Sequence, residues 1–449
     1  MAATDEIEID SVNRQLTDLT QQSLDEATQR GASAAEVVVN RSQGLSVTVR
    51  LGEVETVEYN RDKNMVINVY FGQKGGSAST SDFSPKAIKE TVFAACSIAK
   101  YTAEDACAGL ADVDRLAKDI PDLDLDHPWN LSLDEAIRLA TDCEDAARSA
   151  DERITNSEGA SISSHRGTEV YANTHGFIGS VTGTRHSVSC AVIGEKDGLM
   201  QRDYWYSSAR DSDELEAPRQ VGNIAATRTL RRLGARKITT RETPVLFEAP
   251  AACGLLSHLV SAVRGSSLYR KASFLLDQLG EPVFPEFVRI YERPRLLKGL
   301  GSRAFDNEGV ATEDRDLVNQ GVLRGYVLDS YSARKLGMQT TGNAGGVHNL
   351  IIEPGSLDLE GLMKEMHTGF LVTELIGFGV NMVTGDYSRG AVGFWVEDGQ
   401  IQHAVEEITI AGNLKTMFRT IEQVGNDVDR RGNIRSGSIL LRNLTVAGA

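Results

Sequence analysis

The chain has 449 residues, of which 41% are hydrophobic and 24% are charged, a composition typical of a folded protein of two or three domains. Its formal net charge of −16 and its pI of about 5.1 disfavour nonspecific nucleic-acid binding, because a phosphate backbone would be repelled. No apolar run has the length of a membrane span, and the acidic N-terminus lacks the pattern of a signal peptide.

The cysteines are few and scattered. All five lie outside any CxxC pair, so neither a disulfide framework nor a zinc ribbon is indicated. Such a chain suits a reducing compartment. Together with the charge and the lack of apolar spans, this predicts a cytoplasmic protein that binds neither membrane nor nucleic acid.

The first region predicts a helix followed by an antiparallel meander. Apolar residues at helical spacing begin near Val12 and stop at Gly31, a helix end. Alternating apolar residues then predict strands with one wet face, joined first by a turn at Gly52. These strands are expected at 45–51, 54–59 and 65–71. Ser84-Pro85 opens the next helix, since proline is tolerated at the first helical position.

The middle region begins with an acidic segment, residues 109–130, which contains two prolines and is the best linker candidate. Ser132 and Glu135 form a capping box for a helix that ends near Ala150. A run of short strands separated mostly by glycine follows, and then a helix at 219–233. The strands are expected at 161–165, 169–173, 177–183, 187–193 and 203–209.

The third region starts near Lys237 and combines a buried strand at 244–248, a helix around His258 and many β-segments. Helix-flanked sheets with hairpins, rather than regular alternation of strands and helices, predict a multi-domain α+β fold. We expect a helix-flanked antiparallel or mixed N-terminal sheet and a β-rich C-terminal domain. The predicted domains are residues 1–120, 121–236 and 237–449.

Residues 377–413 are the most informative segment. They predict short strands joined by glycine-rich turns at 384–386 and 397–399, with an apolar run between them. The sequence of this segment resembles the C-terminal signature of the PmbA (TldE) family. Further similar segments occur in the same order, at 203–211, 306–312, 328–338 and 340–344, so the resemblance covers nearly the whole chain.

The resemblance implies a cytoplasmic peptidase system of bacteria or archaea. PmbA-type chains pair with TldD-type zinc metallopeptidases, and their substrates are unfolded peptides, such as a microcin precursor and an antitoxin. The family's older label is "modulator of DNA gyrase". We therefore expect a heterodimer with a TldD-type subunit, with a homodimer possible in isolation.

A zinc-protease helix can be checked residue by residue. Zincins place two histidines on one helix with a glutamate beside the first, so that both rings reach the ion and the acid activates its water. TldD-type enzymes resemble a variant, His-Glu-x-x-x-His, with a cysteine near the C-terminus. Here His258 matches the first ligand, but Leu259 and Val263 occupy the other two positions, and no cysteine follows Cys253. We expect no catalytic residue, metal or cofactor in this chain, and zinc in the partner.

Two other functions stay open. The chain could be a hydrolase with a metal site assembled from the histidines at 165, 175, 186 and 348, or a homodimeric peptide-binding protein. His367 and Glu374 could also share one helix. Large apolar interfaces are expected in each case, so dimerisation does not decide between them.

Two loops are candidates for lining a cleft. The glycine-rich loop 342–346 lacks the Lys-Ser/Thr of a phosphate-binding loop, so we interpret it as a flexible loop over a cleft. The candidate cleft residues are Asp306, Asn307, Glu308, Gly342, Asn343, Gly345 and Gly346. The chain would then complete a closed chamber around the partner's zinc, and a strand edge could hold an extended peptide.

Overall fold

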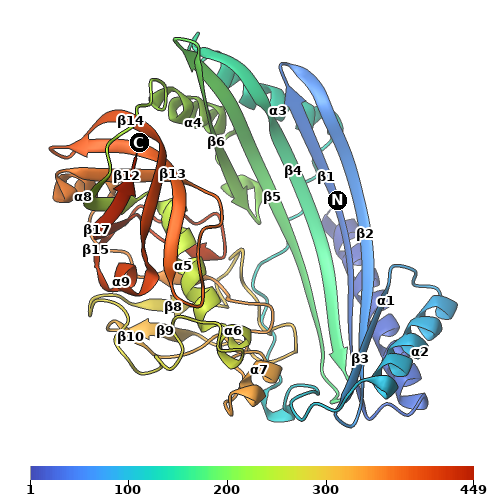
Figure 1. Ribbon diagram of the computed structural model, residues 1–449. Coiled ribbons are helices and arrows are strands. Elements are labelled where there is room, and N and C mark those ends of the chain that lie inside the picture. The colour runs from blue at the N-terminus through green and yellow to red at the C-terminus, as the bar shows by residue number, and fades with distance from the viewer. Residues whose placement is uncertain (1, 449) are drawn as a thin grey trace.

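The computed structural model describes the backbone of residues 2–448 and the side chains of residues 10–448. The chain forms one long sheet, a closed C-terminal sheet and a smaller third sheet (Figure 1). The long sheet has six antiparallel strands in the order β3-β2-β1-β4-β5-β6. They are β1 (Ala34–Arg50), β2 (Glu53–Phe71), β3 (Lys74–Thr80), β4 (Ile154–Asn173), β5 (Ile178–Lys196) and β6 (Leu199–Ala209).

The long sheet unites the first two predicted domains. β1 pairs with β4 from Glu36↔Asn173 to Val49↔Ala160, so strands from either side of residue 120 lie next to each other. The two regions therefore share a single sheet.

The strands are longer than predicted, because segments expected as separate strands merge into β2, β4 and β5. Gly167, which separates two of the predicted strands, lies inside β4 opposite Gly183 of β5. A Cβ atom on Gly183 would lie 2.7 Å from the guanidinium of Arg210. A close approach of another side chain, rather than a turn, explains this glycine.

Two pairs of helices cover the same face of the long sheet, one pair near each end (Figure 1). They are α1 (Ala2–Gln29) with α2 (Pro85–Tyr101), and α3 (Leu133–Arg148) with α4 (Pro218–Arg231). Val39 of β1 enters the first core and Val47 enters the second, as expected for odd-numbered residues on one face. The predicted caps are confirmed, since the Ser84 and Ser132 hydroxyls accept hydrogen bonds from backbone N–H groups.

The predicted linker at 109–130 is irregular but is not a free linker. Five of its apolar side chains share a core with Phe305 and Val310 of the third region, namely Ala111, Leu116, Ala117, Leu123 and Leu125. Leu110 is buried as well, whereas Val113 and Ile120 are exposed. The segment packs against the third region because its leucines are buried on an apolar surface there. Its acidic composition did not indicate this packing.

The C-terminal sheet closes on itself. Its order is β14-β13-β12-β7-β17-β15, and β14 also pairs with β17. Its strands are β7 (Arg241–Phe247), β12 (Gly369–Ile376), β13 (Asp386–Glu397), β14 (Gln400–Asn413), β15 (Ile421–Val424) and β17 (Ile439–Ala447). The predicted buried strand at 244–248 and the turns at Gly385 and Gly399 are confirmed.

A smaller sheet, in the order β10-β9-β8-β11-β16, completes the third region. Its strands are β8 (Ile290–Glu292), β9 (Arg315–Asn319), β10 (Val322–Leu323), β11 (Leu350–Ile352) and β16 (Ile434–Arg435). The remaining helices are α5 (Ala249–Val263), α6 (Gly265–Tyr269), α7 (Ser330–Lys335), α8 (Leu359–Met366) and α9 (Leu414–Arg419). The α+β class with a β-rich C-terminal domain is confirmed. No helix in the described part of the chain has the length and apolarity needed to cross a membrane.

Candidate functional site

Helix α5 carries His258 next to the closed sheet. The imidazole meets the ring of Tyr387, on β13, edge to face, with 6.0 Å between the ring centroids. Its Nε2 is buried and has no hydrogen-bond partner among the described residues. Burial lowers the pKa of His258, and the nearby charge of Arg389 lowers it further, so the ring is neutral at pH 7.

The residues around His258 do not fit a zinc ion. Leu259 and Val263 are fully buried in the core of the third region and offer only hydrocarbon. Burial raises the pKa of the Tyr387 phenol to about 12, so this group keeps its proton. A zinc site needs several His, Cys or carboxylate ligands, whereas the charged neighbour here is the cation of Arg389. Across the described residues, no group of three or more such side chains is placed to hold a metal ion.

The four histidines considered for an alternative metal site do not converge. His186 pairs with Ser164 across β4 and β5, so it faces the opposite side of the sheet from His165. The rings of His175 and His348 lie 3.2 Å from the carbonyl oxygens of Ala111 and Gly342 respectively. The expected helix carrying His367 and Glu374 is also wrong, because α8 ends at Met366 and Glu374 lies on β12.

The two candidate cleft loops pack against each other. Asp306 is fully buried and accepts hydrogen bonds from the backbone N–H groups of Glu308, Val310 and Ala344. Asn307 and Gly345 are exposed, but a Cβ atom on Gly345 would lie 2.6 Å from the Asn307 amide. The loops are therefore close-packed partners instead of flexible cleft walls.

Hydrogen bonds of the Asn343 side chain also fix the loop 342–346. Asn343 is buried, and its amide donates to the Glu292 carboxylate at 3.0 Å and to the Gly346 carbonyl at 3.0 Å. Gly342 has a φ of 68° and Gly346 has a φ of 123°, values that favour glycine over any other residue. The glycines thus serve a tight buried turn.

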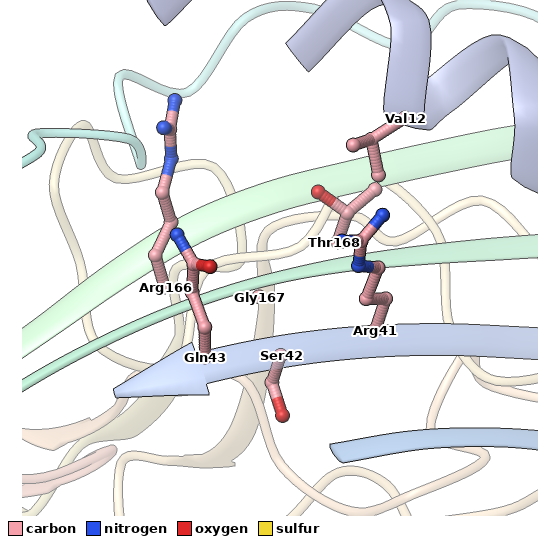
Figure 2. A pocket seen from close by; sticks show the side chains of 7 residues that line it. All are labelled: Val12, Arg41, Ser42, Gln43, Arg166, Gly167 and Thr168. Carbon is pink, nitrogen blue, oxygen red and sulfur yellow. The ribbon is translucent and has the colours of Figure 1, made fainter. Parts of the chain in front are cut away.

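Small cavities lie on the helix-covered face of the long sheet, between the two helix pairs. One has a volume of about 50 Å³ and is lined by Val12 of α1 and by side chains of β1 and β4, including Arg41, Gln43 and Arg166 (Figure 2). A neighbouring cavity of about 290 Å³ includes His186. Arg166 is engaged by Asp126, with hydrogen bonds of 2.8 and 2.6 Å.

A larger cleft, of about 570 Å³, lies between β6 and the turn 430–435. Its lining includes Lys298 and three arginines, although the chain as a whole is acidic. In the sequence, residues 426–432 were considered only as a place for a zinc-ligating cysteine, and this cleft was not predicted. The cluster of three arginines in the six residues 430–435 is the sequence feature that could have indicated a cationic site.

Comparisons with known proteins identify the same family in all three regions of the chain. Family models match the PmbA/TldA metallopeptidase domain 1 at residues 35–99, the central domain at 126–233 and the C-terminal domain at 240–448. The chain is 53% identical to the metalloprotease PmbA of Escherichia coli O157:H7 over 93% of each chain. It is 50% identical to a metalloprotease PmbA homolog of Haemophilus influenzae over 94% of each.

Solved structures share the fold. A Bacteroides thetaiotaomicron protein named as a modulator of DNA gyrase has a TM-score of 0.92 and 30% identity, with 96% of this chain and 99% of that chain covered. A Thermotoga maritima protein with the same designation has a TM-score of 0.87 and 26% identity, with 96% and 100% covered. With three consecutive domain matches, close relatives over nearly the full length and the same architecture, this chain belongs to the PmbA/TldE family of metalloprotease-type proteins.

Proposed function

We propose that this chain is the non-catalytic subunit of a TldD/TldE-type metalloprotease that degrades or processes unfolded peptides. A TldD-type partner would carry the zinc and perform hydrolysis. This chain would bind no cofactor, and would form part of the wall of a chamber that admits only unfolded chains. Microcin precursors and antitoxins are the kinds of substrate that the family resemblance suggests.

The observation that carries this proposal is the hydrocarbon next to His258. Leu259 cannot take a proton from water and Val263 cannot donate an electron pair, and both are fully buried in the core. A metal ion held by one imidazole would be weakly bound, and the charge of Arg389 near His258 would weaken it further.

The role of this chain's own residues would be to position the peptide. Strand β6 ends the long sheet and runs beside the cleft at Ser207, Ser208 and Ala209. An extended peptide can add to such an edge through backbone hydrogen bonds, which tolerate many sequences. Only a chain without tertiary structure can offer its backbone in this way, which supports unfolded substrates.

Co-expression with a TldD-type protein tests the proposal. Each chain alone and the purified mixture would be assayed on one unfolded peptide, with metal content measured for every sample. We expect cleavage and stoichiometric zinc in the mixture, cleavage that stops when the partner's motif glutamate is replaced by glutamine, and no zinc in this chain alone.

The same assay separates the other two functions. Cleavage by this chain alone, lost on chelation together with bound zinc, would identify it as a hydrolase in its own right. Peptide binding without any association with the TldD-type chain would identify a homodimeric binding protein. Either result would overturn the subunit proposal.

A further inference from the structure

The cleft beside β6 is built by three separate parts of the chain. Its volume of about 570 Å³ lies within the range of ligand-binding clefts. One wall is the end of β6, another is the segment around Lys298, and the third is the turn 430–435. The lining residues are Asp124, Ser207, Ser208, Ala209, Glu214, Glu216, Leu297, Lys298, Leu300, Arg430, Arg431 and Arg435.

Two of the cations in the cleft are already matched. Arg431 forms hydrogen bonds of 2.8 and 2.9 Å with the Asp429 carboxylate and donates to the Tyr206 carbonyl at 3.1 Å. Its guanidinium also lies 3.9 Å from the centroid of the Trp205 ring. Lys298 lies 2.7 Å from Asp211. Arg431 thus fixes the turn 430–435 against β6, and Lys298 fixes the segment around it to Asp211.

The acids of the cleft are occupied as well. Glu214 lies 3.3 Å from the Lys298 ammonium. Glu216 accepts a hydrogen bond of 3.1 Å from the Trp205 indole, and Asp124 lies 3.0 Å from the ring of His127. None of these carboxylates forms an ion pair with the two remaining arginines.

Arg430 and Arg435 are the two cations left over. Neither forms an ion pair or a side-chain hydrogen bond with any described residue, and the Nε of Arg435 is buried without an acceptor. Arg430 is exposed, and Arg435 is half-buried on β16. Burial lowers the pKa of Arg435, and the charge of Arg430 lowers it further, so the two guanidiniums are close enough to repel each other. The Nε of Arg435 is buried from water and has no protein acceptor among the described residues, so an anion in the cleft would supply the partner that this guanidinium lacks.

We propose that Arg430 and Arg435 form a binding site for a carboxylate of a peptide that lies along β6. The guanidinium fork matches the two oxygens of a carboxylate. A nucleic acid suits the cleft less well, because it carries a charge at every nucleotide and its further phosphates would meet Glu214, Glu216 and Asp124, whereas a peptide brings one carboxylate to the two arginines. The carboxylate belongs either to the C-terminus of the peptide or to an Asp or Glu side chain. This inference rests on the proposed function, and it assigns the substrate contact to particular residues.

The experiment measures binding of short unfolded peptides to the full chain by fluorescence anisotropy at fixed ionic strength. The first peptide consists of Ser, Ala, Gly and Thr and has a free C-terminal carboxylate. The second is the same peptide with a C-terminal amide, and the third adds one internal Glu to the amide form. The variants are Arg430→Gln and Arg435→Gln. The control is Arg442→Gln, which removes an equal charge from an exposed arginine outside the cleft.

We expect each cleft variant to bind the acid peptide about tenfold more weakly than the wild type, because a charge-assisted hydrogen bond is lost. The control should bind like the wild type. Weak binding of both amide peptides would identify the C-terminal carboxylate as the ligand, whereas rescue by the internal Glu would identify a side chain. Arg430 is exposed, so its variant should fold normally, which an unchanged thermal midpoint would confirm.

Three results would overturn the carboxylate site: equal binding of all three peptides, cleft variants that bind like Arg442→Gln, or no binding of any peptide by the full chain. If the mixture with a TldD-type protein nevertheless cleaves the amide peptide as fast as the acid peptide, the proposed subunit function stands without this site. If the mixture shows no cleavage but the arginines still bind the acid peptide, the subunit function fails and the site stands.

Discussion

Two of the places where the long sheet meets the third region have opposite electrostatics. At the first, the α4 contact, Arg228 and Arg232 lie among Asp203, Glu248 and Glu374, with N–O distances of 2.7 to 3.5 Å. Figure 1 shows helix α4 between the long sheet and the C-terminal sheet. Its carboxylates and cations are matched, so the charges persist although Arg232 and Asp203 are buried.

The second place, the loop contact, buries carboxylates without cations. Glu308 lies near the phenols of Tyr70 and Tyr171, which Glu36 of the long sheet also approaches, and near Asp306. Burial raises the pKa of Asp306 to about 6 and that of Glu308 to about 7. The acids of the first contact have cations beside them, whereas burial without a cation raises the pKa of the acids in the second. The first contact should therefore depend on its partners and the second on pH.

Removing a cation from the α4 contact should have the largest effect. Arg232→Ala removes the guanidinium that lies 2.7 Å from Glu374 and 3.5 Å from Asp203, so that, among the described residues, Asp203 keeps only Arg228, at 3.4 Å. We expect a loss of about 3 to 5 kcal/mol in the free energy of unfolding, since a buried charge loses its partner. Thermal and denaturant unfolding of the full chain would measure it.

The matched control is Arg442→Ala, which breaks an exposed pair with Glu422 and should cost less than about 1 kcal/mol. Equal losses for the two variants would mean that burial does not distinguish the α4 contact from the surface.

Replacing the acid of the loop contact should give the next largest effect, with the opposite sign. The folded pKa of Glu308 is about 7 against an ordinary value of 4.5, so the folded state binds the proton more tightly. Stability is then greatest below pH 4.5 and falls as pH rises through 7. Glu308→Gln should remove the part of this slope that Glu308 contributes, leaving that of Asp306, and stabilise the protein by roughly 3 kcal/mol above pH 7.

The measurement is the free energy of unfolding across this pH range for the wild type and Glu308→Gln. The amide oxygen can still accept the Ser330 N–H that Glu308 accepts at 2.9 Å, so the variant removes the charge and keeps the acceptor. Parallel pH profiles for the two proteins would contradict the assignment of the raised pKa to Glu308.

Much of the fold could be predicted from local patterns. Ser84-Pro85, the Ser132–Glu135 box and the turn glycines at 385 and 399 act within a few residues, so the sequence displays them directly. Strand lengths could not be predicted in this way, because Gly167, a glycine between two predicted strands, is paired with Gly183 inside the ladder, and that pairing joins residues distant in the chain. The burial of residues 109–130 was not predicted for the same reason, since the apolar surface on which they pack is formed by residues near 305.

The candidate site was predictable only in part. The hydrocarbon at 259 and 263 is visible in the sequence because a zinc motif has fixed spacing. The loops at 306 and 342 pack closely on each other, and a role in lining a cleft stays a prediction, because glycine indicates a special backbone shape whether or not a ligand is near. The charge balance of the cleft depends on which acids Arg431 and Lys298 occupy, and only the folded chain shows that Arg430 and Arg435 are left over.

The smallest expected effect tests whether the rim of the loop contact behaves like its centre. Arg303 lies 2.7 Å from Glu169 of β4, and both side chains are more than a quarter exposed, at 28% and 29%. Water screens such a pair, so Glu169→Gln should change the free energy of unfolding by less than about 1 kcal/mol, and less still at high salt. Unfolding at low and high salt would measure it. A loss as large as that of Arg232→Ala would mean that an ion pair supports the loop contact too, and that the contrast between the two contacts is one of degree.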